Sequence, residues 1–141
     1  MAIKTYDPNE LSIVIGNRAI NGFAEDSAVT IEFEDAQYGL TTDIHGSPTR
    51  FRLNKNVAKI TLNLTQSSSS NDALSSFVEL DRVNNAGVFT IMVKDNSGTT
   101  LFASPECYID QIPSVEFGND NKNRSWTIIA IRPTKFIGGV K

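Results

Sequence analysis

The sequence predicts a mainly β fold, an antiparallel β-sandwich or barrel with one flanking α-helix at about residues 71–83. Two stretches, 29–34 and 57–64, alternate strictly between apolar and polar residues, which is the period of a strand with one buried and one solvated face. Turn residues separate most of the apolar runs, so neighbouring strands pair as hairpins. Nine or ten strand segments without alternating βα units favour an antiparallel arrangement.

The composition bounds the class of protein. The 141 residues carry 13 Lys and Arg against 16 Asp and Glu, a net charge of −3. A chain of this length fits one domain, so we expect residues 1–141 to form a single one. The acidic balance argues against an outer surface that binds nucleic acid by releasing counterions. No apolar run approaches the roughly 20 residues of a membrane span, and the N-terminus lacks the basic and apolar segments of a signal peptide.

The first strands are joined by short connections. Residues 11–15 (LSIVI) form a β-branched run, a Gly-Asn pair at 16–17 supplies a turn, and residues 18–20 return as a paired strand. The strand at 29–34 then shows an acidic face. Its polar positions are Thr30, Glu32 and Glu34.

Residues 35–56 combine two glycines, a proline and many polar residues with short β-like pieces at 40–44 and 49–53. A structureless loop of about twenty residues is rare in a compact domain. We therefore predict a protruding hairpin arm at about 37–54 that turns at 45–48. An arm of this length either closes a ligand pocket or reaches a neighbouring copy.

Residues 57–82 join the cleanest strand to the only convincing helix through a run of serines. One face of the strand is apolar, and the opposite face carries Lys59, Thr61 and Asn63. Asn71 and Asp72 offer side-chain oxygens to the free N–H groups of the helix. Its apolar residues fall at helical spacing and must pack on a sheet; they are Leu74, Phe77 and Val78.

Strands dominate the rest of the chain. Asn and Gly residues at 84–87 end the helix, with Gly87 available for the left-handed position. A strand at 88–95 turns at 96–98 and returns at 99–103, and two further pieces at 107–112 and 114–117 are interrupted by Pro113. Residues 124–133 carry large apolar groups on both faces, as in a strand covered on both sides, with Pro133 ending it before an extended tail.

The sequence lacks the constellations that enzymes need. His45 is the only histidine and Cys107 the only cysteine, which excludes a zinc site with two imidazoles in one chain. His45 reads as a solvated turn residue and Cys107 as a partly buried strand residue. The carboxylates of Glu32, Glu34 and Asp35 read as a solvated strand face, because nothing nearby would desolvate them. We predict no enzymatic activity, no cofactor and no metal.

The order of these features along the whole chain resembles the tail tube proteins of contractile-tailed bacteriophages. The matching segments are AVTIEFED, VAKITLNLTQSS running into NDALSSFVEL, GVFTIMVKD, and SWTIIAIRPTKFIGG. The fold of that family is similar to that of the tube protein of the type VI secretion system. The resemblance implies a virion structural protein, made in the host cytoplasm and located in the tail, that assembles as hexameric rings stacked into a hollow tube through which DNA passes during ejection.

The resemblance also implies partners and surfaces. The partners would be other copies of the chain, the tail sheath, the tape-measure protein and the baseplate, with double-stranded DNA passing without sequence-specific binding. Polar residues of the two alternating strands would face the lumen, namely Thr30, Glu32, Glu34, Lys59, Thr61 and Asn63. The arm would contact the adjacent ring through Tyr38, Leu40, Ile44, His45, Arg50 and Phe51.

Two other classes of function remain open. A small soluble β-sandwich that binds a ligand or carbohydrate is the first alternative, and a hydrolase is a distant second. Carbohydrate-binding modules commonly expose aromatic platforms, whereas here the aromatic residues mostly fall on apolar strand faces. Those that look available are Tyr6, Tyr38 and Tyr108.

Overall fold

The computed structural model describes residues 3–25, 28–34 and 36–139, so Asp35, one of the three carboxylates considered above, lies outside the described residues. Within them, the secondary structure is mainly β, with antiparallel strand pairing and one α-helix, which confirms the predicted fold class. The elements are η1 (Pro8–Glu10), β1 (Leu11–Ile15), β2 (Arg18–Ala19), β3 (Val29–Phe33), β4 (Tyr38–Thr42), β5 (Pro48–Arg52), β6 (Val57–Thr65), α1 (Ser70–Asn84), β7 (Phe89–Asp95), β8 (Leu101–Gln111), β9 (Asn123–Ile131) and β10 (Thr134–Phe136).

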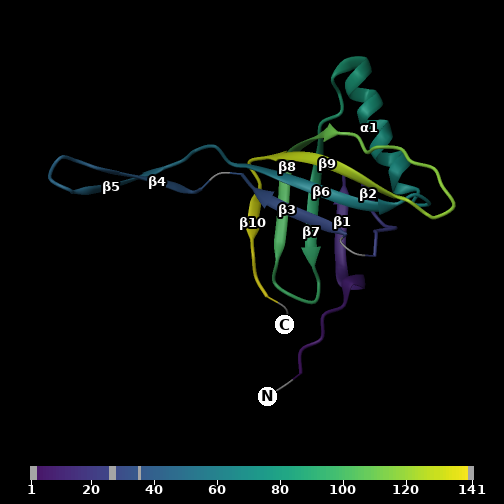
Figure 1. Ribbon diagram of the computed structural model, residues 1–141, viewed down its shortest axis with the longest axis horizontal. Helices are drawn as coiled ribbons and strands as arrows, with labels where there is room; N and C mark the ends of the chain where they lie inside the picture. Colours follow the sequence, from purple (N-terminus) through teal and green to yellow (C-terminus); the bar gives the residue numbers. More distant parts are fainter. Residues whose placement is uncertain (1–2, 26–27, 35, 140–141) are drawn as a thin grey trace.

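The main sheet has the order β2-β1-β7-β8-β9-β6-β3, and β10 pairs with β8 beside this path. Strand β8 joins the two halves of the sheet. It pairs with β7 along one edge, while its other edge pairs first with β10 and then with β9. Register shifts in both of the long pairings bend the strand. The sheet therefore folds over, and β1, β7 and β8 run across the direction of β9, β6 and β3 (Figure 1).

The core lies between these two halves. On β6, Ala58, Ile60, Leu62 and Leu64 are fully buried, while the alternate residues are only half-buried, as the alternation of the sequence predicts. The opposite half contributes Ile13, Ile15, Ile91, Val93 and Phe102, and β9, beside β6, adds Trp126 and Ile128. One face of β6 thus packs in the core, and the other face points away from it.

Helix α1 follows β6 and projects from one side of the body (Figure 1). Leu74 is completely buried in the core, and Phe77 and Val78 pack against it in a half-buried state. The ring centroid of Phe77 lies 4.6 Å from that of Phe89 on β7. The predicted apolar face of the helix is therefore the face that packs on the sheet.

The prediction for the two ends of α1 needs correction. The N-cap is Ser69, which makes no side-chain capping bond. Asn71 is buried and bonds to other parts of the chain, so it is not a cap. At the other end the left-handed position is held by Asn85, with φ of 58°, instead of by Gly87. Gly87 is needed for close packing, because a Cβ there would lie 2.4 Å from the carbonyl oxygen of Phe77.

The C-terminal half also differs from the prediction. A single strand, β8, replaces the pieces expected at 99–103 and 107–112, and residues 112–122 form no strand, which corrects the strand expected at 114–117. Pro105 is tolerated inside β8 because it lies at a register shift, where its missing N–H breaks no ladder bond. Arg132, with φ of 51°, and Pro133 end β9 and allow the chain to resume as β10.

Candidate functional site

The residues expected to face a lumen lie together on the outward face of β3 and β6. In the antiparallel register Thr30 lies opposite Thr61, and Glu32 lies opposite Lys59. Both residues on β3 are exposed, and those on β6 are half-buried. Glu34 is exposed directly after β3 and continues the same alternation. Period-two geometry thus collects hydroxyl groups and opposite charges on one surface that has no part in the core.

Strand β9 extends this polar face, a contribution that the sequence did not reveal. Ser125 lies opposite Asn63, and its hydroxyl hydrogen-bonds the Asn63 Oδ1 at 2.6 Å. Thr127 lies opposite Thr61. The expectation that both faces of residues 124–133 are covered is wrong, because Thr127, Ile129 and Ile131 remain half-exposed on the outer side. Because Ile129 and Ile131 are apolar, nothing in the sequence indicates that this face of β9 is partly exposed.

The two ends of the sheet are open. Among the described residues, β3 pairs only with β6, and β2 pairs only with β1. Each edge strand therefore has main-chain N–H and C=O groups on its outer side that none of the described strands covers. Open edges of this kind are a template for pairing with another chain.

Strands β4 and β5 form a separate two-stranded sheet that extends far from the body (Figure 1). They begin two and one residues earlier than the β-like pieces predicted from the sequence. The turn lies at 43–47 instead of 45–48, because the Asp43 Oδ1 accepts hydrogen bonds from the backbone N–H groups of His45 and Ser47 at 2.9 and 2.8 Å. We refer to residues 37–54 as the arm.

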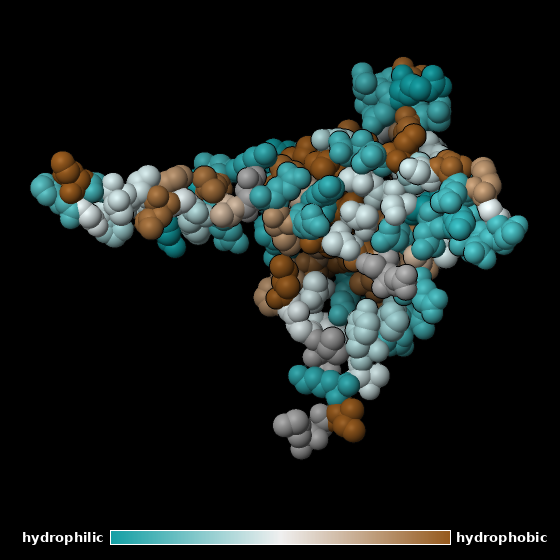
Figure 2. Space-filling model, viewed as in Figure 1, coloured by the Kyte–Doolittle hydropathy of each residue, from teal (hydrophilic) through white to brown (hydrophobic). Residues whose placement is uncertain are grey.

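The arm is stiffened by its own side chains. The ring of Phe51 covers Gly39 so closely that a Cβ at this glycine would lie 2.2 Å from the ring. The guanidinium carbon of Arg50 lies 4.1 Å from the ring centroid of Tyr38. Leu40 and Ile44 are 68% and 94% exposed, and His45 is exposed in the turn. The space-filling view shows apolar atoms at the far tip of the arm, away from any core (Figure 2).

The described residues do not offer a metal-binding cluster. They contain no group of three or more His, Cys, Asp or Glu side chains placed to hold a metal ion. Cys107 is fully buried on β8, and burial raises the pKa of its thiol, an effect that a hydrogen bond with Ser104 opposes. Within the part of the chain that the structure describes, no helix has both the length and the apolar character to span a membrane.

One curated protein is closely related in sequence. The chain is 38% identical over 146 residues to the structural protein ORF10 of Pseudomonas phage KPP10, an alignment that covers 96% of this chain and 83% of the relative. No protein-family model matches the chain.

Solved structures share the fold. A chain of the cap that terminates the tube of the anti-feeding prophage superposes with a TM-score of 0.66 at 15% identity, covering 96% of this chain and 94% of that one. A chain of the sheath–tube complex of the PVC extracellular contractile injection system gives 0.66 at 13% identity, with 94% and 91% covered. A chain of the sheath/tube terminator of the same system gives 0.62 at 16% identity, with 97% and 100% covered.

Proposed function

The chain belongs to the family of the structural protein ORF10 of Pseudomonas phage KPP10, and on this basis we propose that it is a structural subunit of a phage tail tube. The phage relative and the fold shared with contractile injection systems confirm the resemblance to tail structural proteins of contractile phages. In our proposal the subunits form hexameric rings that stack into a hollow tube in the virion tail. The tube conducts DNA during ejection and has no enzymatic activity.

The observation that carries this proposal is that one sheet has both a polar outward face and two open edges. Rings of identical subunits leave no unpaired edges when the sheet of each copy continues into that of the next. The face that such a closed barrel turns inward must be polar if the channel is wet. The outward face of β3 and β6, extended by Ser125 and Thr127 of β9, has this character.

The lumen residues in this proposal are the polar side chains on that face, Thr30, Glu32, Glu34, Lys59, Thr61 and Asn63. Three of them carry a hydroxyl or amide group and three carry a charge, and the charged groups are two carboxylates and one ammonium group. Such a wall holds no cluster of cations that would bind the phosphate backbone of DNA tightly. Double-stranded DNA would pass without sequence-specific contacts.

The arm supplies the contact between rings. Residues 40–56 are all exposed, so the arm offers apolar and polar groups to another molecule. A contact between two different surfaces of identical subunits repeats without closing, which produces a filament of stacked rings. Sheath, tape-measure and baseplate proteins would bind other surfaces of the assembled tube.

A second candidate within the same class is a tube terminator. Two of the three solved structures described above are of a tube-terminating cap and of a sheath/tube terminator. A terminator forms a ring that ends the tube and does not stack on itself. A small ligand-binding β-sandwich, the alternative from a different class, would remain a monomer or a small closed oligomer.

Sedimentation of the purified protein over a range of concentrations and salt separates these functions. A tube subunit gives rings that grow into polymers of increasing mass as the concentration rises. A terminator stops at the mass of one ring, and a ligand-binding module stays small. A particle of monomer mass under every condition would contradict the proposal of a tube subunit.

A further inference from the structure

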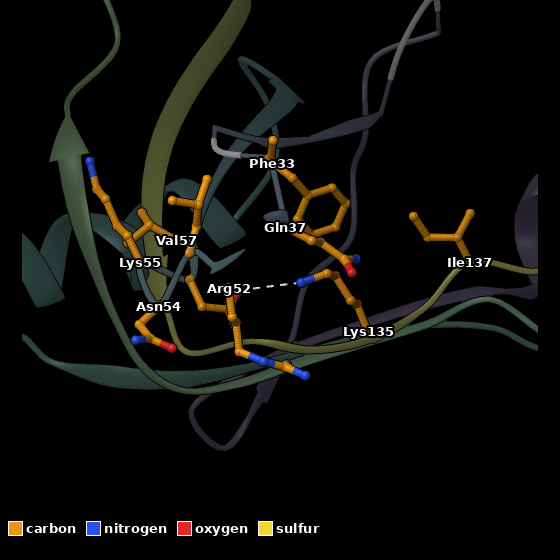
Figure 3. Close-up of a pocket in the computed structure, with 11 residues that line it drawn as sticks. Phe33, Gln37, Arg52, Asn54, Lys55, Val57, Lys135 and Ile137 are labelled. Carbon is orange, nitrogen blue, oxygen red and sulfur yellow. Dashed lines mark hydrogen bonds between the residues drawn. The ribbon is translucent and has the colours of Figure 1, made fainter. Parts of the chain in front are cut away.

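A recess lies where the arm joins the body. Its volume is about 470 Å³, and it is bounded by the end of β3, the base of the arm, the start of β6 and the β10 segment. Figure 3 shows Phe33, Gln37, Arg52 and Lys135 around this hollow, with Ile137 at one side. We call it the arm-base recess.

The arm-base recess is cationic. The described residues that line it include Arg52, Lys55 and Lys135 but no Asp or Glu. The ammonium group of Lys135 donates to the Asn56 Oδ1 at 3.2 Å and lies 4.9 Å from the ring centroid of Phe33. The guanidinium carbon of Arg52 lies 5.3 Å from the ring centroid of Tyr38. Among the described residues neither Arg52 nor Lys135 has a carboxylate partner.

The recess also has apolar walls. Phe33 is half-buried beside Lys135, and Leu53 and Ile137 are 37% and 72% exposed at its rim. Two cations beside exposed apolar side chains suit an occupant that carries carboxylates next to an apolar group, because each part of the occupant then gains a matching neighbour.

The chain itself carries such a segment, the loop 115–120 with the sequence VEFGND. Phe117 is 76% exposed, and Glu116 and Asp120 on either side of it are exposed too. In the described part of the chain, neither carboxylate has an ion-pair or hydrogen-bond partner. We call this segment the acidic loop.

The acidic loop belongs to the connection between β8 and β9, which lies on the side of the body away from the arm (Figure 1). The loop of one molecule therefore cannot enter the recess of the same molecule. A head-to-tail contact between identical copies joins two different surfaces, such as this recess and this loop.

We propose that the arm-base recess of one copy receives the acidic loop of a second copy. Glu116 and Asp120 pair with Arg52 and Lys135, and Phe117 packs on the apolar wall beside Phe33. This inference rests on the proposed function, since it presupposes that copies of the chain assemble. It adds which two surfaces meet and which charges hold them.

Charge reversal tests the pairing. The variants R52E/K135E and E116K/D120K should each raise the concentration needed for assembly at least about tenfold at low salt, since tenfold corresponds to the loss of only about 1.4 kcal/mol. The quadruple variant restores opposite charges and should return to within about threefold of the original protein. Circular dichroism and thermal unfolding verify that each variant is folded.

Control variants reverse a charge of the same sign at one residue elsewhere. Lys94→Glu on β7 and Glu10→Lys in η1 alter exposed residues outside the recess and the loop. Both should assemble like the original protein. Disulfide formation between Lys135→Cys and Glu116→Cys variants, mixed under oxidising conditions, gives a second measurement in which the buried Cys107 takes no part.

The outcomes separate the two proposals. An original protein that never assembles overturns both. If it assembles while the reversed variants assemble equally well, the pairing is wrong and the tube proposal stands. Failure of the folded quadruple variant to recover, without disulfide formation in the mixture, also overturns the pairing. So does binding of a DNA oligonucleotide that depends on Arg52 and Lys135 while self-assembly does not.

Discussion

The indole Nε1 of Trp126 donates a hydrogen bond of 2.9 Å to the Oδ1 of Asn71, which ties β9 to the first turn of α1. The Nδ2 of the same Asn71 donates to the carbonyl oxygens of Thr65 and Ser68 at 3.0 and 3.1 Å. The buried amide of Asn71 thus connects the end of β6, the serine-rich segment that follows it, and β9.

Replacing Asn71 with Ala should therefore destabilise the subunit. The change removes three hydrogen bonds and leaves a buried indole N–H without a partner, which predicts a loss of about 2 to 3 kcal/mol in the free energy of unfolding. Denaturant unfolding measures it. Ser75→Ala, on the exposed side of the same helix, is the control and should stay within about 0.5 kcal/mol. Equal values for the two variants would contradict the role given to Asn71.

Cys107 should make stability depend on alkaline pH. Burial raises the pKa of its thiol above the ordinary value of 9.0, so the folded state keeps the proton that the unfolded state releases. The contribution is fully present below pH 9.0 and is lost as the pH rises through the folded pKa. Denaturant unfolding from pH 7 upward measures this loss, and Cys107→Ala should show a smaller decline. If the free energy of unfolding of the original protein and of Cys107→Ala fell equally with rising pH, Cys107 would not be the group responsible.

The arm should be dispensable for folding and necessary for stacking. Replacing residues 41–49 with Asn-Gly shortens the hairpin through a favourable two-residue turn and removes no core residue. We expect the free energy of unfolding of the subunit to change by less than about 1 kcal/mol. Electron micrographs should show rings without tubes. Tubes of normal length in the shortened variant would exclude the arm from the contact between rings.

The polar face of β3 and β6 should be protected inside assembled tubes. Glu32→Cys and Thr61→Cys should react with a bulky maleimide when subunits are dispersed and resist it in intact tubes. Val83→Cys is the control, because Val83 is 71% exposed on α1, an element that has no part in the proposed lumen face. Rapid labelling of Glu32→Cys or Thr61→Cys from outside intact tubes would show that this face does not line the lumen.

The alternation of apolar and polar residues correctly predicted which side chains of a strand face the core. The alternation in 57–64 assigned the buried and outward faces of β6 correctly, because a strand places successive side chains on opposite faces wherever it packs. The prediction for Asn71 is wrong because an asparagine at the start of a helix fits a cap and a buried bridge equally well. Only its distance to Trp126 distinguishes them.

Features formed by residues far apart in the chain could not be predicted from the sequence, because no local pattern encodes them. The arm-base recess joins Phe33, Arg52 and Lys135, residues from the beginning, middle and end of the chain that meet only after the sheet folds over at β8. The bend itself depends on register shifts around residues 104–111, which leave no periodic signal. The outward position of Thr127 on β9 was hidden by its apolar neighbours.

Electron microscopy of the purified protein at high concentration tests the central claim most directly. The account predicts rings of six-fold symmetry with an open centre, stacked end to end into tubes of uniform diameter. Images that show only dispersed monomers at every protein and salt concentration would contradict it.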